Sequence, residues 1–560
     1  MKPLLTMHNP AVARQYYIDG YWKQDTYYSL LRQHAHAQPR AWALRDSRNR
    51  LTYAQLLEAV DELAVELHSA GLVAGDRVSI WLPNAIEAVV IFLACSRNGY
   101  VANTSLHQNY TVDEVIRLMT RMESGALFAK PGYGADADRR DIFSEARKLP
   151  FLKCLYTFDE DTHCRLRYVP VDGDAKTDVK LPAWDTNADK VSYLAFTSGT
   201  TGEPKGVMHS DNTLLANGRA MVEEWGLVPE SVIFTLSPLS HHIGTVALSQ
   251  MLVAGAELVV NDCPPGLEVL DYIRESGATY VMGVPTHAMD LLAKLHQQNR
   301  TDLGQVRTFY MAGSPIPREV AQAFLDMGIR PQNVYGMTEN GSHQFTLPTD
   351  DVETVVATCG RACKGFEVSI WDQEDRDRRL GPSEIGEIAS RGAQLMLGYF
   401  ANQHATQSSF NRYGWFMSGD LGWLDENGCL HIAGRKKDLI IRGGHNIHPS
   451  NIEALAIRHP GIAAAAAVPV PDERLGEKVC LAVVNDQHLE PYDVLEHLND
   501  EGLSKYDMPE YFITMDTFPM TASGKILKRQ ITEWVREGKL KPEPVRWTGS
   551  RHNTEGGLIT

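Results

Sequence analysis

The sequence predicts an α/β protein with a large N-terminal domain of parallel α/β subdomains plus a small β-barrel-like part, and a small mobile C-terminal α/β domain. Three observations predict this class. Over about the first 330 residues, apolar strand-like runs alternate with helical patterns, which implies parallel sheets covered by helices. From about residue 350 to 433, short strands and glycine-rich turns take over, and a compact mixture of strands and helices follows residue 438. At 560 residues, the chain can form several domains with a large buried core.

The α/β alternation begins with a β-rich strand over 78–82, followed by a helical pattern over 86–97. Short apolar runs predict the strands, and apolar residues spaced three and four apart predict the helices. The further strands are expected at 191–196, 231–236, 256–261, 279–284 and 306–311. The further helices are expected at 212–224, 245–253, 267–276, 287–298 and 318–327.

The C-terminal third begins with a hairpin, in which strands 416–424 and 429–433 flank an Asp-Glu-Asn-Gly turn. We place the domain boundary after residue 434, with a hinge over 435–438. The small domain then spans 439–545 and the polar tail 546–560. In the small domain we expect helices at 450–459 and 491–501 and strands at 462–468 and 478–484.

The bulk composition excludes several classes of protein. A net charge of −16 argues against a nucleic-acid-binding surface, which needs a basic stripe. The N-terminus has no apolar signal segment, and the longest apolar stretch, 85–95, is too short to span a bilayer, so we expect no transmembrane segment and a cytoplasmic protein. The 8 scattered cysteines are typical of reduced thiols, and no second close pair completes a zinc site with Cys359 and Cys363.

The segment from Thr197 to Gly206, Thr-Ser-Gly-Thr-Thr-Gly-Glu-Pro-Lys-Gly, has the composition of a polyphosphate-binding loop. Its glycines let backbone N–H groups approach an anion, and its hydroxyls and one ammonium add donors. It is not a Walker loop, because Gly206 follows Lys205 where that pattern needs Ser or Thr. An ordinary polar loop is the alternative. The residues expected to contact phosphate are Thr197, Ser198, Gly199, Thr200, Thr201, Gly202 and Lys205.

Five further strings follow in order: Tyr-Gly-Met-Thr-Glu at 335–339, Ser-Gly-Asp at 418–420, Gly-Arg-Lys-Lys-Asp at 434–438, Gly-Gly-His-Asn-Ile-His-Pro at 443–449 and Thr-Ala-Ser-Gly-Lys at 521–525. With the phosphate loop, they make the chain similar to the AMP-forming acyl-CoA synthetases of the adenylating enzyme superfamily. The resemblance covers about residues 28 to 535. Within the superfamily the chain most resembles bacterial short- and medium-chain fatty acyl-CoA ligases and cyclohexanecarboxylate-type CoA ligases.

The resemblance implies a role for each motif residue in binding and activating ATP. Glu339 would ligate Mg²⁺, and Thr338 would hydrogen-bond the α-phosphate. Tyr335 would stack on adenine, while Asp420 and Arg435 would hold the ribose hydroxyls. A solvated loop acid at 339, a turn cap at 420 and a surface cation at 435 are the alternatives.

Lys525 is implied to be the catalytic ammonium, which stabilises charge between the α-phosphate and the carboxylate during adenylation. Lys437 occupies the family's hinge position, where the small domain swings between the two half-reactions. Gly443 and Gly444 would let pantetheine pass close to the backbone, although a plain turn would also explain them. One departure is His445, where many relatives have Glu.

The sequence gives less information about the acid pocket than about the nucleotide site. Pro-Leu-Ser-His at 238–241 matches the family's motif beside the substrate carboxylate, so Ser240 and His241 are pocket candidates, with His242 a weaker one. We expect small or mildly polar residues to form the far wall of the acid pocket and the adjoining nucleotide contacts, namely Gly313, Ser314, Gly336, Met337 and Gly341. None of them offers a counter-charge, so we expect an uncharged medium-chain or alicyclic monocarboxylic acid.

The sequence therefore predicts an ATP-dependent acid–CoA ligase that uses ATP, Mg²⁺ and coenzyme A. We expect it to work as a monomer or homodimer. Two alternatives stay open at this point. An adenylating enzyme could load a carrier protein or make acyl-AMP only, and a nucleotide-sensing protein could use the same fold without catalysis.

Overall fold

The computed structural model describes residues 2–159, 165–169, 182–197, 204–262, 264, 266–314, 316–485, 489–520 and 526–549. The chain divides into two compact units. The first comprises Met1–Val368, Ala389–Phe416 and Asn427–Leu430, and the second comprises Ser369–Ile388, Met417–Glu426 and His431–Thr560. Within the described residues, none of the helices combines the length and apolar character needed to cross a membrane.

The first unit contains two largely parallel sheets. In the described residues, the larger sheet has the order β16 (Arg361–Ala362), β15 (Gly341–Phe345), β14 (Arg330–Met337), β13 (Thr308–Ala312), β12 (Tyr280–Gly283), β10 (Val232–Thr235), β11 (Glu257–Val260), β1 (Trp42–Arg45), β2 (Arg50–Thr52). The smaller sheet has the order β7 (Leu166–Val169), β6 (Cys154–Phe158), β5 (Ser124–Ala129), β3 (Arg77–Trp81), β4 (Val101–Asn103), β8 (Val191–Thr197), β9 (Lys205–Ser210). Antiparallel pairing is confined to the strands at the sheet margins.

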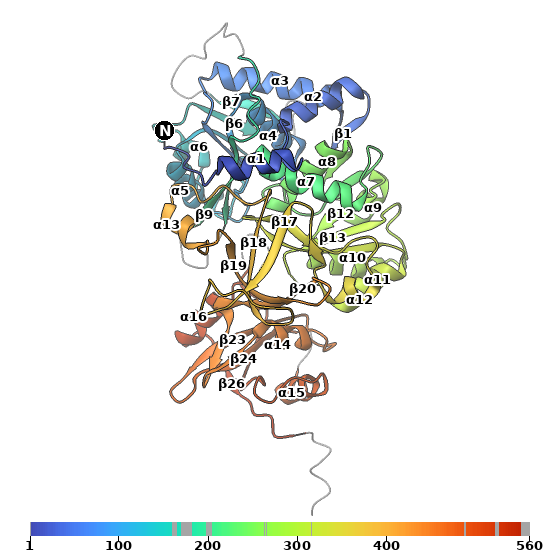
Figure 1. The fold of residues 1–560 in the computed structure, drawn as a ribbon, viewed down its shortest axis with the longest axis vertical. Coiled ribbons are helices and arrows are strands. Elements are labelled where there is room, and N and C mark those ends of the chain that lie inside the picture. Colours follow the sequence, from blue (N-terminus) through green and yellow to red (C-terminus); the bar gives the residue numbers. More distant parts are fainter. Residues whose placement is uncertain are drawn as a thin grey trace, which may run out of the picture. The chain divides into compact units, whose positions relative to one another are not determined.

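Helices cover both faces of these sheets. Between the sheets lie α2 (Tyr27–Ala37), α3 (Tyr53–Ser69), α4 (Ile86–Asn98), α7 (Asp211–Trp225) and α8 (His242–Ala254). Helices α5 (Val112–Met122) and α6 (Ile142–Ala146) cover the outer face of the smaller sheet. Helices α9 (Val269–Ser276), α10 (Pro285–Gln297) and α11 (Arg318–Asp326) cover the outer face of the larger sheet and lie beside one another in Figure 1.

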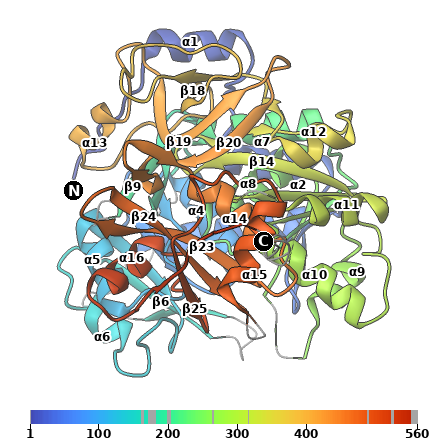
Figure 2. The ribbon, with the colours of Figure 1, turned by 90° about the horizontal axis from the view of Figure 1, so that it is seen from below.

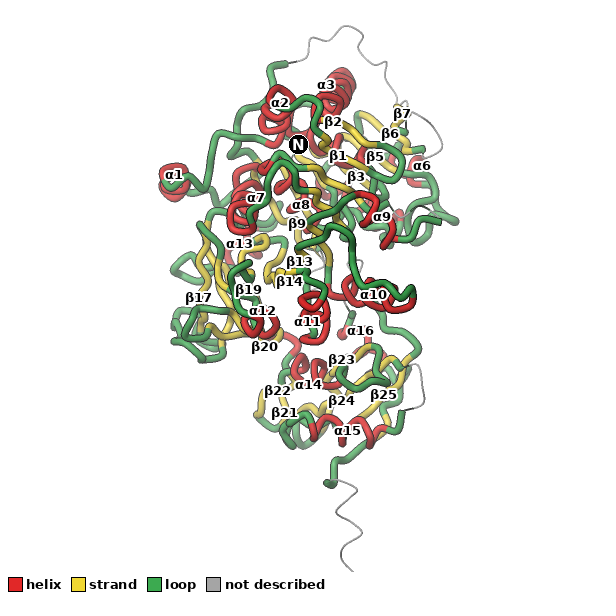
Figure 3. Tube along the Cα trace, turned by 90° about the vertical axis from the view of Figure 1, so that its right-hand side faces the viewer, coloured by secondary structure: helices red, strands yellow, loops and turns green. Residues whose placement is uncertain are grey.

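The buried strands are apolar on both faces, as parallel strands between helices must be. In β8, Tyr193 and Ala195 pack into the core between the sheets, whereas Leu194 and Phe196 pack into the outer core with α5 and α6. Helices α2 and α3, which close the inner core at one side, lie side by side in Figure 3. The predicted α/β alternation is therefore confirmed, with element ends shifted by a few residues.

The remaining elements outside the small domain are short. They are α1 (Pro10–Ile18), α12 (Val352–Ala357), α13 (Gln403–Ser408) and a four-stranded sheet ordered β17 (Phe366–Trp371), β18 (Gly386–Gly392), β19 (Phe416–Leu424), β20 (Leu430–Arg435). Strands β19 and β20 are the predicted hairpin. Most residues of this sheet belong to the second unit.

The C-terminal part of the second unit is built on one sheet with helices on both faces. Its elements are η1 (Lys436–Asp438), β21 (Ile440–Arg442), β22 (His445–Ile447), α14 (Pro449–Ala456), β23 (Ala464–Asp472), β24 (Gly476–Val484), α15 (Pro491–Asp500), β25 (Tyr511–Met515), α16 (Lys528–Arg536) and β26 (Glu543–Pro544). Alternate residues of β23 face different cores: Ala465 and Ala467 pack with α14 and α15, whereas Ala466 and Val468 pack with α16. Figure 2 shows these three helices around β23 and β24.

Candidate functional site

Most predicted site residues of the first unit follow the carboxyl ends of parallel strands, where ligands bind in open α/β sheets. Thr197 ends β8, and Gly313 and Ser314 follow β13 directly. Tyr335, Gly336 and Met337 close β14, and Thr338 and Glu339 follow that strand. Ser240 and His241 come after β10 and precede α8.

The phosphate-loop sequence connects two antiparallel strands. Thr197 at the end of β8 is the register partner of Lys205 at the start of β9, and the Thr197 hydroxyl donates to the Lys205 carbonyl oxygen at 3.4 Å. The predicted loop residues between them, Ser198, Gly199, Thr200, Thr201 and Gly202, lie outside the described residues. Strand β9, which lies between this segment and helix α7, was not predicted from the sequence.

Lys205 and Glu339 are both in contact with Tyr399. The Lys205 ammonium lies 4.7 Å from the centroid of the Tyr399 ring, a cation–π distance. The Tyr399 hydroxyl donates to Glu339 Oε1 at 2.9 Å. Burial, and then the Glu339 charge, raise the pKa of Tyr399 above its ordinary value, so the phenol remains a donor. The structure therefore places the loop lysine and the predicted metal carboxylate on one side chain that sequence reasoning missed.

Thr338 is held through its backbone by His209 of β9. His209 Nε2 lies 2.7 Å from the Thr338 carbonyl oxygen, and Nδ1 lies 3.0 Å from the Thr213 hydroxyl. Burial lowers the pKa of His209 to about 4, so the ring is neutral at physiological pH. Its ring stacks on His242, with centroids 5.6 Å apart and an interplanar angle of 24°.

The turn that carries Glu339 is tight. The Met337 amide donates to Asn340 Oδ1 at 3.0 Å, and the Asn340 amide donates back to the Met337 carbonyl at 3.2 Å. A Cβ atom on Gly336 would overlap the Gly341 carbonyl of the paired strand, so only glycine fits there. Tyr335 meets His343 edge to face at 5.4 Å.

Loops from the two sheets are hydrogen-bonded to each other next to the predicted acid-pocket motif. The Ser240 hydroxyl lies 3.0 Å from His107 Nδ1, in the loop after β4. Asn84, after β3, accepts from the Leu239 amide at 2.8 Å and donates to the Asn261 carbonyl at 2.7 Å. His241 caps α8 by accepting from the Ile243 amide through Nδ1 at 3.3 Å. The acid-pocket candidates thus lie on a cross-linked set of strand ends.

The second unit holds Asp420 and Arg435 together. Arg435 Nε lies 3.3 Å from Asp420 Oδ1, across the neighbouring strands β19 and β20. The Ser418 hydroxyl accepts from the Asp420 amide at 3.1 Å and donates to the Ile388 carbonyl at 2.6 Å, which fixes the Ser-Gly-Asp string. The pair that was predicted to hold the ribose is therefore preassembled within one unit.

Lys437 lies in the single 3₁₀ turn η1, directly after β20. Gly443 and Gly444 form the two-residue turn between β21 and β22, with φ values of 58° and 86°, and Arg442 pairs with His445 across it. Positive φ at both positions is the geometry of a type I′ hairpin turn, which glycine adopts most easily. The turn interpretation left open by the sequence thus accounts for these glycines, and the pantetheine path stays a prediction.

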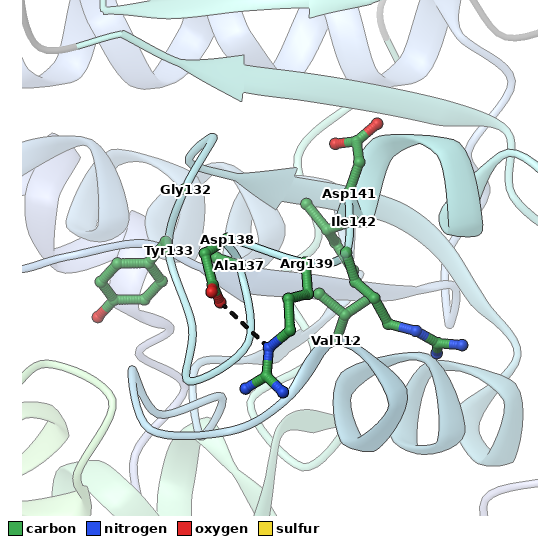
Figure 4. Close-up of a pocket in the computed structure, with 9 residues that line it drawn as sticks. Val112, Gly132, Tyr133, Ala137, Asp138, Arg139, Asp141 and Ile142 are labelled. Atoms are coloured by element: carbon green, nitrogen blue, oxygen red, sulfur yellow. Dashed lines mark ion pairs between the residues drawn. The ribbon is translucent and has the colours of Figure 1, made fainter.

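Lys525 lies outside the described residues, so its predicted catalytic role also stays a prediction. A surface pocket of ≈ 250 Å³ in the first unit contains none of the predicted site residues. It is lined by Val112, Gly132, Tyr133 and residues 137–142, and Figure 4 shows the ion pair in which Arg139 Nε lies 3.6 Å from Asp138 Oδ1.

Two parallel α/β sheets, with motif residues at their strand ends, together with a small α/β domain, define the adenylating class of enzymes. The chain belongs to the AMP-binding enzyme family, which matches residues 31–400, and the AMP-binding enzyme C-terminal domain matches residues 451–525. Within that family the protein is an AMP-forming acid–CoA ligase. The resemblance predicted from the motifs is confirmed.

Two relatives and one solved structure show the spread of the family. The chain is 32% identical to the medium-chain fatty-acid–CoA ligase of Escherichia coli (strain K12), over 94% of this chain and 93% of that protein. It is 30% identical to the 2-hydroxy-7-methoxy-5-methyl-1-naphthoate–CoA ligase of Streptomyces carzinostaticus, over 93% of this chain and 95% of that protein. Among solved structures, the chain matches the O-succinylbenzoate coenzyme A synthetase of Bacillus subtilis in complex with ATP and a magnesium ion. The TM-score is 0.76 and the sequence identity 27%, and the match covers 90% of this chain and 98% of that chain.

Proposed function

We propose that the protein activates an uncharged medium-chain or alicyclic monocarboxylic acid with ATP and transfers the acyl group to coenzyme A. In the first step, a carboxylate oxygen attacks the α-phosphorus of ATP, the bond to the β-phosphate oxygen breaks, and acyl-AMP and pyrophosphate form. In the second step, the CoA sulfur attacks the acyl carbon, the thiol proton is released, and AMP leaves.

The observation that carries this proposal is the assembly of Lys205, Tyr399 and Glu339. Breaking a triphosphate requires charge neutralisation at the leaving pyrophosphate and a fixed position for the α-phosphate. Lys205 supplies a cation at the end of the phosphate-loop sequence, and Tyr399 orients the Glu339 carboxylate at 2.9 Å. A single carboxylate with a fixed orientation fits Mg²⁺, which binds through one or two protein carboxylates plus phosphate oxygens and water. When bound, the ion would neutralise phosphate charge.

The second unit would supply the groups that bind the sugar. The Asp420 carboxylate can accept from two ribose hydroxyls while Arg435, 3.3 Å away, balances its charge. Lys525 would stabilise the charge that develops between the carboxylate and the α-phosphate. Lys437 would act as the hinge, and the Gly443–Gly444 turn would line the approach of pantetheine.

The absence of charge on two buried histidines near the Ser240–His241 segment supports the proposed acid class. Burial lowers the pKa of His107 to about 4 and the pKa of His242 well below 6.5, so both rings are neutral at pH 7. A second carboxylate or an ammonium on the substrate would be desolvated beside neutral groups, at a cost of roughly several kcal/mol. Each additional buried methylene of an uncharged acid instead contributes about 0.8 kcal/mol until the cavity is full. The E. coli medium-chain relative supports the same class.

An acid panel tests this proposal. Purified protein with ATP and Mg²⁺ is offered linear acids of increasing length, cyclohexanecarboxylate, benzoate, succinate and an amino acid, and AMP release is measured with and without CoA. We expect CoA-dependent AMP release, with kcat/KM highest for a medium-chain or alicyclic acid. A maximum at acetate or an amino acid would contradict the acid class, and adenylate formation that CoA does not accelerate would favour loading of a carrier protein.

A further inference from the structure

Two side chains on one face of strand β9 lead to the Thr338–Glu339 segment, His209 by direct contact and Lys205 by way of Tyr399. Lys205 and His209 are four residues apart, and side chains an even number of residues apart share a face of a strand. Lys205 reaches Glu339 through the Tyr399 ring, and His209 reaches the Thr338 carbonyl directly. The strand that begins at Lys205 therefore contacts Thr338 directly and contacts Tyr399, whose hydroxyl holds the Glu339 carboxylate.

The tautomer of His209 follows from its partners. A carbonyl oxygen can only accept, so the nitrogen 2.7 Å from the Thr338 oxygen, Nε2, must carry the hydrogen. Because burial lowers the pKa of His209 to about 4, the other nitrogen, Nδ1, carries a lone pair and faces the Thr213 hydroxyl at 3.0 Å, which also lies 3.0 Å from the Ser210 carbonyl oxygen as a second acceptor for its hydrogen. Both ring nitrogens are thus used, and the orientation of the ring is determined.

The packing around His209 leaves the ring little freedom. Its face lies on the His242 ring, and its centroid is 6.3 Å from that of Tyr193. Thr213, its partner at Nδ1, belongs to the capping box that starts α7. His242 is the first residue of α8. The ring therefore lies between the first turns of α7 and α8, in the core between the sheets.

We propose that His209 is a positioning residue for adenylation: its neutral imidazole fixes the Thr338 carbonyl and so sets the position of the Thr338–Glu339 segment relative to Lys205 at the start of β9. This role rests on the proposed function, because it concerns the step in which acyl-AMP forms. Loss of the Nε2 donor leaves the segment anchored at Glu339, whose carbonyl accepts from the Met396 amide at 2.7 Å and whose carboxylate accepts from the Tyr399 hydroxyl at 2.9 Å, and frees the Thr338 carbonyl. A displacement of about 1 Å at a reacting group costs about 100-fold in rate.

Three substitutions distinguish the two ring nitrogens. His209→Gln places an amide donor near the position of Nε2, His209→Asn places one near Nδ1 only, and His209→Leu supplies neither. The measurement is acid-dependent ATP–pyrophosphate exchange, with KM for ATP, KM for the acid and the melting temperature of each variant. We expect kcat of the Gln variant within about threefold of wild type, and kcat of the Asn and Leu variants about 100-fold lower with both KM values within about threefold.

His34 provides a matched control in the same unit. Its Nε2 lies 2.7 Å from the Leu252 carbonyl, and its Nδ1 lies 3.3 Å from Gln38 Nε2, so its hydrogen bonding resembles that of His209. It joins α2 to α8 and does not contact the Thr338–Glu339 segment. The same three substitutions at His34 should lower the melting temperature and leave kcat within about twofold, because they remove structural contacts only.

Two results would overturn the positioning role. One is a Gln variant as slow as the Leu variant, and the other is a folded Asn or Leu variant with kcat within about twofold of wild type. If the Leu variant does not fold, the kcat of the Asn variant alone tests the positioning role, because asparagine keeps the site polar. A wild-type protein without acid-dependent exchange would overturn the proposed function and this role with it, whereas an active wild type with the wrong order of variants would overturn this role alone.

Discussion

Replacing Tyr399 with phenylalanine removes one oxygen atom and leaves the ring in place. The lost group is the hydroxyl that donates to Glu339 Oε1 at 2.9 Å, while the ring face that receives the Lys205 ammonium at 4.7 Å is kept. A hydrogen bond to a charged partner is worth about 1.5–3 kcal/mol. At about 1.4 kcal/mol per tenfold in rate, the substitution should slow adenylation by about 10- to 150-fold if the whole effect acts in the transition state.

The assay is ATP–pyrophosphate exchange across a Mg²⁺ titration, together with calorimetric binding of ATP with and without Mg²⁺. Because the hydroxyl orients the carboxylate, Tyr399→Phe should weaken the Mg²⁺-dependent part of ATP binding and leave the Mg²⁺-independent part unchanged. Tyr399→Leu should lose a further ~0.5–2 kcal/mol, because the cation–π contact is removed as well.

Tyr17 offers a control of the same chemistry in the same unit, since its hydroxyl donates to Asp189 Oδ1 at 2.9 Å. Tyr17→Phe should leave exchange and Mg²⁺ dependence unchanged. If Tyr399→Phe exchanged pyrophosphate within twofold of wild type at every Mg²⁺ concentration, the hydroxyl would not orient a catalytic carboxylate and the reasoning would be refuted.

Three further predictions address the second unit and the buried His209. Lys525→Ala should abolish acyl-adenylate formation and spare thioester formation from supplied acyl-AMP, whereas Gly444→Leu should do the reverse; equal loss of both half-reactions in either variant would contradict the role of that residue. Lys437→Pro fixes φ near about −65° and should let acyl-AMP accumulate while CoA consumption falls; overall turnover within about twofold of wild type, or ~0.4 kcal/mol, would show that the hinge lies elsewhere. The pKa of His209 falls from 6.5 to about 4 on folding, so the unfolded chain binds this proton first. Stability should therefore decline as pH falls from about 6.5 to 4, by up to about 1.4 kcal/mol per pH unit for this group, and His209→Gln should flatten the slope; a wild-type melting temperature that is constant across this window would contradict the burial argument.

The sequence predicted β3, α4, β8, α7 and the consecutive elements from β10 to α11, because their apolar spacing follows the period of each element. Helix α8 shows where that signal fails: the pattern indicated a start at residue 245, but the helix begins at His242 because His241 caps it with a ring nitrogen. Strand β9 was missed because Gly206 interrupts its apolar residues and leaves no clear alternation. It forms through pairing with β8, which is a tertiary contact that local propensity does not encode.

The motif residues of the site were also predicted, but their supports were not. Glu339 and Thr338 belong to a recognisable string, whereas Tyr399 and His209 touch them from 60 and 129 residues away. A single sequence contains no information that pairs residues at such separations. Gly443 and Gly444 show the opposite limit, because the sequence identified both residues but could not distinguish a ligand path from the hairpin turn that the structure shows.

The carboxamide of Asn84 has a consequence for how this protein is made. It joins Leu239 and Asn261, which follow it by 155 and 177 residues, so the strand ends of the two sheets are tied by contacts of very long range. Contacts of this kind close slowly, because the intervening chain loses much entropy before they form. During synthesis, the hydrogen bond from Asn84 to Asn261 cannot form until residue 261 has been translated and the strands that precede both residues have begun to fold. A chain that ends before residue 261 therefore lacks the link from Asn84 to Asn261, and its strand ends are joined only through Leu239 at this position.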